Sequence, residues 1–168
     1  MQNAQIYAGG SEIAPFVVTT RDLLEEAKIE NTELVESSLG ISEVRHAPDC
    51  FKPSDLAIPA GLKALTKSGV APKDIDCVIY CGIERDCSEP ATAHIIASAM
   101  GLKPRICFDV ANACHGFGSG LQIVSSFIKS GEIRYALVVT AELSSKVTKI
   151  ISSMFKSGAL DISSLKSH

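Results

Sequence analysis

Several common sequence features are missing from this 168-residue chain, and each absence excludes a class of function. No run of basic residues stands out and the formal net charge is −3, which argues against nucleic acid as a partner. No segment approaches the roughly 20 apolar residues that a membrane-spanning helix needs. The first ten residues, MQNAQIYAGG, carry no basic stretch followed by an apolar one, so we expect a cytoplasmic protein without a secretory signal.

The cysteines also lack the spacing of a metal site or of a disulfide framework. The six are Cys50, Cys77, Cys81, Cys87, Cys107 and Cys114. They form no CxxC pair, so we expect no structural zinc or other metal, and without a secretory signal no disulfide framework. Cys77, Cys81 and Cys107 lie in apolar, strand-like runs, where a free cysteine is usually a small buried hydrophobic residue. No cofactor is predicted, and Cys114 is the candidate for chemistry.

Apolar runs of strand length alternate with stretches of helical spacing along the chain. Strands are predicted within residues 4–9, 75–83, 105–113 and 135–143, and helices within 19–29, 31–39, 52–69, 89–101 and 116–131. The runs IDCVIYCGI, RICFDVANA and YALVVTAEL are apolar almost throughout, as in strands that are buried on both faces. The sequence therefore predicts an α/β fold in which helices cover both faces of a mostly parallel sheet.

One helix carries its own start and stop signals. Within KPSDLAIPAGLKALTKSG, Ser54 is the expected N-cap and Gly69 the expected stop. Pro59 inside this stretch indicates either a kink or a later start.

The segment ICFDVANACHGFGSGLQIV places Cys114 where a strand gives way to a helix. Ligands bind at such junctions in α/β sheets. The first turn of a helix supplies unpaired N–H groups and a partial positive charge, and both favour thiolate over thiol. Glycines at 116, 118 and 120 cost helix stability, and we expect them to permit close backbone approach to a neighbouring element or a ligand.

Two other interpretations of this segment remain open on the residues alone. Cys114 could be one more buried thiol beside glycines that only allow tight packing. Alternatively, GFGSGL could bind a dinucleotide, but its third glycine arrives one residue before GxGxxG requires. Glu142 is the acidic residue that this second interpretation would use.

The segment FDVANACHGFGSGLQIVSSFIKSGEIRYALVVTAE closely resembles the active-site region of the β-ketoacyl-[acyl-carrier-protein] synthase III family, within the thiolase-like superfamily. The shared pattern is a strand ending Asp-Val, an Ala-Cys-x-Gly-Phe elbow, a long helix ending Ser-Gly and a strand leading to Ala-Glu. GISEVRHA, SDLAIPAGLKAL, DIDCVIYCG and PATAHIIASAMGL follow in the family's order, so the resemblance covers roughly residues 4–143.

The resemblance implies an acyltransferase in which Cys114 is the nucleophile. It would take an acyl group from a coenzyme A or acyl-carrier-protein thioester and pass it to a carbanion made by decarboxylating a malonyl thioester. The backbone N–H of Cys114 would be one oxyanion donor. Fatty-acid biosynthesis is the implied pathway, with a specialised polyketide-like route left open.

The loop ERDCSEPATA corresponds to the family's segment that crosses a dimer interface, so Glu89 and Pro90 are candidate substrate-binding residues. Glu89 replaces a frequently apolar residue and would suit a short or polar acyl group, although a solvated loop position is equally open. His115 adjoins Cys114 and is a weaker candidate. Leu34 and Ser38 stand where the family has the tryptophan and arginine that grip coenzyme A, so we expect weaker nucleotide binding.

The family's fold has two similar halves, and this chain resembles only the first. We expect a thiolase-like domain over residues 1–143, an atypical helical tail over 144–168, and no C-terminal half. The resemblance assigns the carbanion-stabilising His and Asn to that second half. The chain alone is therefore expected to accept an acyl group but not to perform condensation. The alternative is a non-catalytic or assembly half-subunit, and the implied partner is a second copy or a complementing chain.

Overall fold

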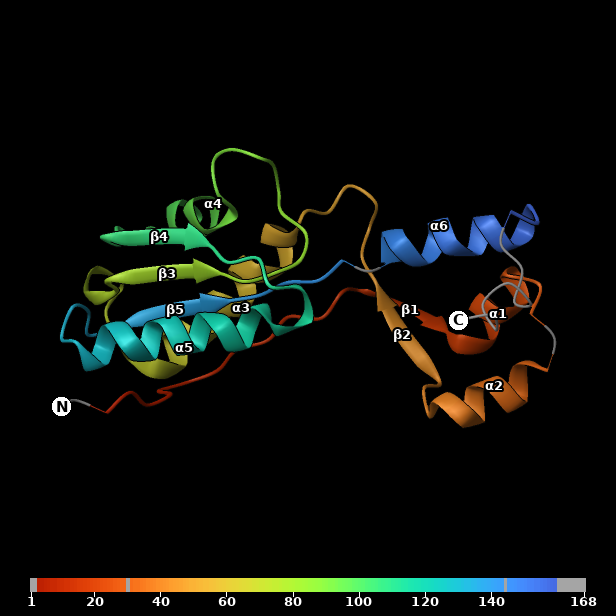
Figure 1. The fold of residues 1–168 in the computed structure, drawn as a ribbon, viewed down its shortest axis with the longest axis horizontal. Helices are drawn as coiled ribbons and strands as arrows, with labels where there is room; N and C mark the ends of the chain where they lie inside the picture. The colour runs from red at the N-terminus through yellow and green to blue at the C-terminus, as the bar shows by residue number, and fades with distance from the viewer. Residues whose placement is uncertain (1–2, 30, 144, 160–168) are drawn as a thin grey trace. The chain divides into compact units, whose positions relative to one another are not determined.

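The structure of the protein is a computed structural model that describes residues 3–29, 31–143 and 145–159, and it divides into two units (Figure 1). The first, called the sheet unit, draws on Met1–Ile13 and Phe51–Glu142. The second, called the two-stranded unit, draws on Ala14–Cys50 and Leu143–His168.

Three parallel strands form the centre of the sheet unit. They are β3 (Cys77–Tyr80), β4 (Ile106–Asp109) and β5 (Ala136–Val139), in the order β4-β3-β5. Cys77 lies opposite Ile106 on one side and Ala136 on the other. Each strand lies within one of the predicted apolar runs, and all four residues of the central strand are buried. A strand covered on both faces has no solvated side, which explains the absence of alternation in its sequence.

Helices cover both faces of this sheet, as predicted (Figure 1). On one face, α3 (Pro53–Ser68) and α4 (Thr92–Ala99) bury residues including Ala57 and Ile96 against the sheet. On the other face, α5 (Gly116–Lys129) packs Val124 and Ile128 against the sheet. Two short 3-10 turns, η1 (Pro72–Asp74) and η2 (Ala113–His115), precede β3 and α5.

Two glycines bring α5 close to the sheet. A Cβ at Gly116 would lie 2.3 Å from the backbone oxygen of Cys81, and one at Gly120 would lie 2.5 Å from the Sγ of Cys81. The expected close approach is therefore confirmed, and the neighbour is the end of the central strand. Gly118 differs, because a Cβ there would meet only the ring of His115.

Two details of the predicted elements are wrong. The helix α3 begins at Pro53 with Lys52 as its N-cap, because proline suits the first helical position and the Asp55 side chain accepts a 2.8 Å bond from the Lys52 N–H. Ser54 instead hydrogen-bonds a distant loop. The helix runs uninterrupted through Pro59, which contradicts the later start, and it ends at Gly69 with φ 67° as predicted.

The strand predicted at residues 4–9 is not formed. This segment belongs to the sheet unit but carries no strand, because β5 at the edge of the sheet pairs only with β3. Gly10 seats the segment on α3, where a Cβ would lie 2.3 Å from the Ala60 oxygen and 2.5 Å from the Ala64 nitrogen.

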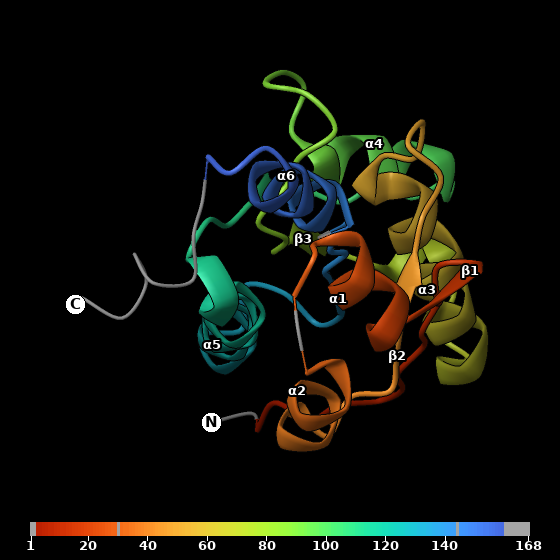
Figure 2. The same ribbon diagram turned by 90° about the vertical axis from the view of Figure 1, so that its right-hand side faces the viewer.

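The two-stranded unit contains an antiparallel pair that the patterning did not predict. Strands β1 (Phe16–Thr19) and β2 (Glu43–His46) pair with each other, and α1 (Thr20–Glu26) and α2 (Thr32–Leu39) form within the predicted helical stretches. The predicted tail helix is α6 (Ser145–Lys156), which lies beside α1 (Figure 2).

The tail helix is tied to its own unit by two ion pairs. Lys156 lies 2.8 Å from Glu26, and Lys149 lies 2.5 Å from Asp49. The predicted domain boundary after residue 143 stays a prediction, and the last part of the predicted tail, residues 160–168, lies outside the described residues. No helix in the described ranges is long and apolar enough to span a bilayer.

We predict that Gly116→Ala destabilises the sheet unit whereas Gly118→Ala does not. Both substitutions gain helix propensity of up to about 1 kcal/mol. At Gly116 the new methyl group meets a backbone oxygen that cannot move aside, and such overpacking costs about 1–3 kcal/mol. At Gly118 the exposed His115 ring can rotate away. Chemical denaturation of the two variants measures the difference, and equal stabilities would contradict the close packing.

Candidate active site

Cys114 lies in a tight turn between β4 and α5. The chain leaves β4 at Asp109, forms η2 over Ala113–His115 and enters α5 at Gly116. Ala113 has φ 41°, a left-handed conformation that costs free energy for any residue with a Cβ. The thiol is exposed rather than buried, which contradicts the alternative of one more buried cysteine.

The elbow is tied to the helix that follows it. The Asn112 side-chain amide donates a 2.8 Å hydrogen bond to the Ser119 hydroxyl, one turn into α5. The N-cap of α5 is His115, and no side chain caps the helix there. The amides of the first turn therefore keep their partial positive charge for a group bound at the elbow.

The buried end of β4 is organised by Asp109, whose side chain is 5% exposed. Its carboxylate accepts hydrogen bonds from the N–H groups of Thr92 at 2.9 Å and Ala93 at 2.8 Å, and Arg85 lies 3.6 Å away. The N-cap of α4 is Ala91, which has no capping oxygen, so Asp109 caps this helix from a different element. The carboxylate thus links β4, α4 and the preceding loop directly before the elbow.

The loop of residues 84–91 is fixed at its base by Asp86. Its carboxylate accepts hydrogen bonds from the Ser54 N–H at 3.0 Å and hydroxyl at 2.5 Å, and its own N–H donates to the Thr92 hydroxyl at 3.1 Å. These contacts hold the loop to the starts of α3 and α4. Sequence reasoning missed Asp86 and Asp109. The one available signal was Ala91, an N-cap residue unable to cap its own helix.

Three predicted substrate-binding residues are not joined to Cys114 in the structure. Glu89 and Pro90 are exposed at the outer part of the loop, with a cis peptide bond between them. His115 is exposed, and its ring lies beside Gly118. Among the described residues, no hydrogen bond or ion pair connects any of the three to Cys114. Their roles stay predictions.

The remaining cysteines fall into two groups. Burial raises the pKa of the Cys77 thiol from 9.0 to about 12 and the pKa values of Cys81 and Cys107 to about 11. These three thiols stay protonated at neutral pH. Cys50 and Cys87 are exposed, as is Cys114, so exposure alone does not distinguish the predicted nucleophile.

Three further positions from the sequence analysis make only local contacts. Glu142 accepts hydrogen bonds from the Ile83 N–H at 3.2 Å and the Thr140 hydroxyl at 3.3 Å, so its carboxylate is already used within the fold. Leu34 and Ser38 lie exposed on α2, where the Ser38 hydroxyl bonds the Leu34 carbonyl at 2.8 Å. Neither presents an aromatic face or a cation to a nucleotide.

Comparison with known proteins shows which family this arrangement resembles. The family model of 3-oxoacyl-[acyl-carrier-protein (ACP)] synthase III matches residues 108–157, which include the elbow. The β-ketoacyl-[acyl-carrier-protein] synthase III of Natranaerobius thermophilus is 35% identical over 148 residues, and that of Clostridium acetobutylicum is 36% identical over 149. This chain is similar to the β-ketoacyl-[acyl-carrier-protein] synthase III family.

The fold comparisons agree and set the extent of the match. A variant of OleA from Xanthomonas campestris superposes with a TM-score of 0.87 at 28% identity, covering 98% of this chain and 53% of that protein. The 3-oxoacyl-(acyl carrier protein) synthase III of Xanthomonas oryzae pv. oryzae gives 0.84 at 29%, covering 92% and 48%. The fold is therefore thiolase-like, as predicted.

The chain spans about half the length of the relatives that it matches. The alignments cover 88% of this chain but 44% of the Natranaerobius protein and 45% of the Clostridium protein. The matched family region also continues through α6 to residue 157, beyond the predicted boundary at residue 143.

We predict that iodoacetamide at pH 8 modifies three cysteines of the folded chain, Cys50, Cys87 and Cys114. The other three stay protonated because burial raises their pKa values to about 11 or 12. As the pH rises toward 11, Cys107 should react next, since it is only half-buried. Intact-protein mass spectrometry counts the adducts, and Cys114→Ala should carry two. A fourth adduct at pH 8, or an unmodified Cys114, would contradict this arrangement.

Proposed function

We propose that this chain is the acyl-accepting part of a ketoacyl synthase III-type acyltransferase, with Cys114 as the nucleophile. The observation that carries the proposal is the exposed thiol on a strained strand-to-helix elbow, in front of helix amides that no side chain caps. The family match over residues 108–157 includes this elbow.

The proposed first step is a thioester exchange. The Cys114 thiolate attacks the carbonyl carbon of an acyl thioester of coenzyme A or acyl-carrier protein, and a new C–S bond forms. The carbonyl oxygen becomes an oxyanion that the Cys114 N–H can stabilise, as the uncapped amides of this turn favour negative charge. Collapse of this intermediate breaks the original C–S bond, and the carrier leaves as a thiolate that takes a proton from water.

The proposed second step needs groups beyond those at the elbow. Decarboxylation of a malonyl thioester releases carbon dioxide and leaves a carbanion, which must be stabilised while it attacks the acylated Cys114. The family resemblance assigns the stabilising His and Asn to a second half, and this chain covers 44% of the Natranaerobius relative. We therefore assign acylation to this chain and condensation to an assembly that adds those groups.

Glu89 is proposed to influence which acyl group is accepted. The loop that carries it is fixed at its base by Asp86, and the Glu89 side chain is exposed. Burying a long alkyl chain against an ionised carboxylate is unfavourable, so a short or polar acyl group is the better substrate. Pro90 shapes the same loop, and His115 forms part of the surface beside the thiol.

Incubation with a panel of acyl-coenzyme A and acyl-carrier-protein thioesters is expected to add one acyl mass to the chain. Cys114→Ala should lose this adduct, because the thioester requires the Cys114 sulfur. Intact-protein mass spectrometry at pH 7 gives both the site and the acyl group. Because Leu34 and Ser38 offer no grip on the nucleotide, carrier-protein thioesters should acylate faster than coenzyme A thioesters.

Two exposed cysteines provide matched controls for this experiment. Cys87→Ala and Cys50→Ala remove thiols that are equally exposed, and both variants should acylate like the parent chain. Adding malonyl thioester to the acylated chain should leave the adduct in place. Adduct loss in either control variant, or efficient condensation by the chain alone, would overturn the assignment.

We predict that Glu89→Leu raises the rate of acylation by long-chain thioesters relative to acetyl thioesters by about tenfold. The substitution removes the desolvation of a carboxylate, an effect on the order of 1.4 kcal/mol for that ratio. The isosteric Glu89→Gln should give a smaller shift in the same direction. Competition between acetyl and dodecanoyl thioesters, followed by mass spectrometry, measures the ratio. An unchanged ratio in both variants would leave Glu89 as a solvated loop residue only.

A further inference from the structure

The consecutive residues 83–86, called the platform, are each tied to a different element of the sheet unit. The Ile83 N–H donates a 3.2 Å hydrogen bond to the carboxylate of Glu142, just beyond β5. The Arg85 guanidinium forms an ion pair with the last residue of β4. The Asp86 carboxylate accepts two hydrogen bonds from the start of α3. Three of the four platform residues are thus held by three separate elements.

The fourth platform residue, Glu84, is tied through its carbonyl to Tyr80, the last residue of the central strand β3. The Tyr80 hydroxyl lies 2.7 Å from the Glu84 carbonyl oxygen and 2.9 Å from the Ala141 carbonyl oxygen. Neither carbonyl has another hydrogen-bond partner among the described residues. A phenol carries one proton, so a single buried donor serves two carbonyls that have no other.

The surroundings of this hydroxyl keep it protonated and in place. Burial raises the pKa of Tyr80 above its usual value of 10.0, so the hydroxyl remains a donor throughout the neutral range. The backbone at Gly82 leaves the space that the hydroxyl occupies, because a Cβ there would overlap the hydroxyl oxygen. A tyrosine fits at the end of β3 because the second residue after it has no side chain.

The platform carries a short tip, residues 87–90, which contains Glu89. All residues of the tip are exposed. In the described part of the chain, no hydrogen bond or ion pair joins the tip to another element. The Cys87 thiol lies 3.6 Å from the Pro90 carbonyl oxygen, a contact within the tip itself. The platform before the tip and the start of α4 after it therefore set where Glu89 stands.

We infer that Tyr80 is a positioning residue for acyl selectivity, because its hydroxyl holds the platform that places Glu89. This inference rests on the proposed function, in which the Glu89 carboxylate disfavours long acyl chains. Without the hydroxyl, the Glu84 and Ala141 carbonyls lose their shared donor, and a carbonyl without a donor away from solvent is unfavourable. The Glu84 peptide turns toward water, the tip moves with it, and discrimination against long acyl chains falls.

Tyr80 differs from the other platform anchors in how little else depends on its polar atom. Asp86 also holds the starts of α3 and α4, and Asp109 caps α4, so removal of either carboxylate disturbs a helix. The Tyr80 hydroxyl contacts only the two carbonyls, whereas its ring belongs to the core between the sheet and the helices α3 and α4. Tyr80→Phe therefore removes the loop contact and keeps the packing.

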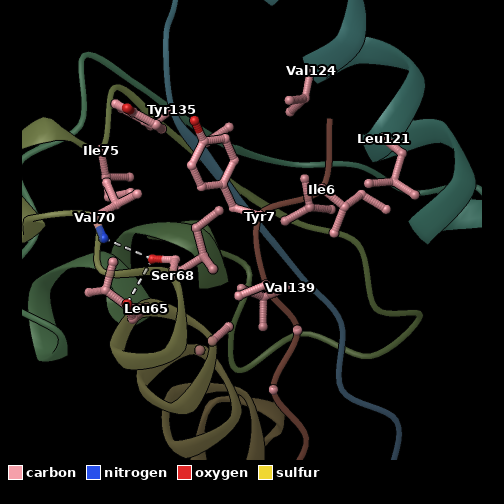
Figure 3. A pocket seen from close by; sticks show the side chains of 18 of the residues that line it. Ile6, Tyr7, Leu65, Ser68, Val70, Ile75, Leu121, Val124, Tyr135 and Val139 are labelled. Carbon is pink, nitrogen blue, oxygen red and sulfur yellow. Dashed lines mark hydrogen bonds between the residues drawn. The ribbon is translucent and has the colours of Figure 1, made fainter. Parts of the chain in front are cut away.

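Hydrogen–deuterium exchange of Tyr80→Phe tests the loop contact. Peptides that cover residues 82–93 should exchange about fivefold faster than in the parent chain, the factor expected from a lost hydrogen bond. Peptides from β4 and α5 should exchange as before. Tyr135→Phe is the matched control, since that ring meets Tyr7 edge to face at 5.6 Å and its hydroxyl forms no hydrogen bond among the described residues (Figure 3). The control should leave residues 82–93 unchanged.

Competition between acetyl and dodecanoyl thioesters, read by intact-protein mass spectrometry, tests the effect on selectivity. Tyr80→Phe should raise the ratio of dodecanoyl to acetyl adduct about threefold, whereas Tyr135→Phe should not change it. In the Glu89→Leu background, Tyr80→Phe should leave the ratio unchanged, because no carboxylate remains to be positioned. A general loosening of the fold would instead change the ratio equally in both backgrounds.

Each remaining outcome has a defined meaning. Unaltered exchange over residues 82–93 in Tyr80→Phe would overturn the inference whatever the acylation results. Faster exchange with an unaltered ratio, or an equal change of the ratio with and without Glu89, would overturn the role in selectivity. If circular dichroism shows that Tyr80→Phe does not fold, Gly82→Ala replaces it, because the new methyl group displaces the hydroxyl. A parent chain that takes up no acyl group would overturn the proposed function, while the exchange result still decides whether Tyr80 holds the loop.

Discussion

The close contact between α5 and the end of β3 is the constraint on which the site depends. Gly116 and Gly120 let the helix approach the Cys81 backbone and side chain to distances that no other residue permits. The chain between β4 and α5 consists of residues 110–115. It turns through η2, with Ala113 in a left-handed conformation, and Cys114 is exposed at the bend.

A buried carboxylate supports the same region from the opposite direction. Asp109 ends the strand that leads to the elbow, and its oxygens cap α4 while Arg85 balances its charge. A charged group so far from solvent is costly unless hydrogen bonds and an ion pair satisfy it, and here both are present. One side chain therefore links the loop before α4, the helix itself and the end of the strand that leads to the Cys114 elbow.

The sequence predicted those features that depend on local pattern. The apolar runs predicted β3, β4 and β5, because strands buried on both faces are apolar throughout. Gly69 predicted the end of α3, because a left-handed C-cap favours glycine. The local pattern does not indicate which residues far apart in the sequence will contact each other. Ser54 looked like a cap because serine often is one, but its hydroxyl bonds Asp86, 32 residues away. Residues 4–9 have strand composition without a strand, since strand formation needs a neighbour in register and the segment has none.

The same distinction applies to the candidate site. Cys114 could be chosen from its junction and its glycines, yet the six cysteines separate into exposed and less exposed sets only when the structure is known. Glu89 and Pro90 could be placed on a loop, but the anchors that hold this loop, Asp86 and Asp109, come from contacts that sequence spacing does not reveal.

The discontinuous make-up of the two-stranded unit has a consequence for synthesis of the chain. Its α6 helix contacts α1, and the Lys156–Glu26 pair joins residues 130 positions apart. At about 5–20 residues per second, a ribosome needs roughly 7–26 s to travel from one to the other. During that interval α1, α2 and the β1–β2 pair are made but lack their last helix, while the whole of residues 51–142 emerges. The parallel sheet can therefore mature on the nascent chain first, and the smaller unit closes only after its final segment has been translated.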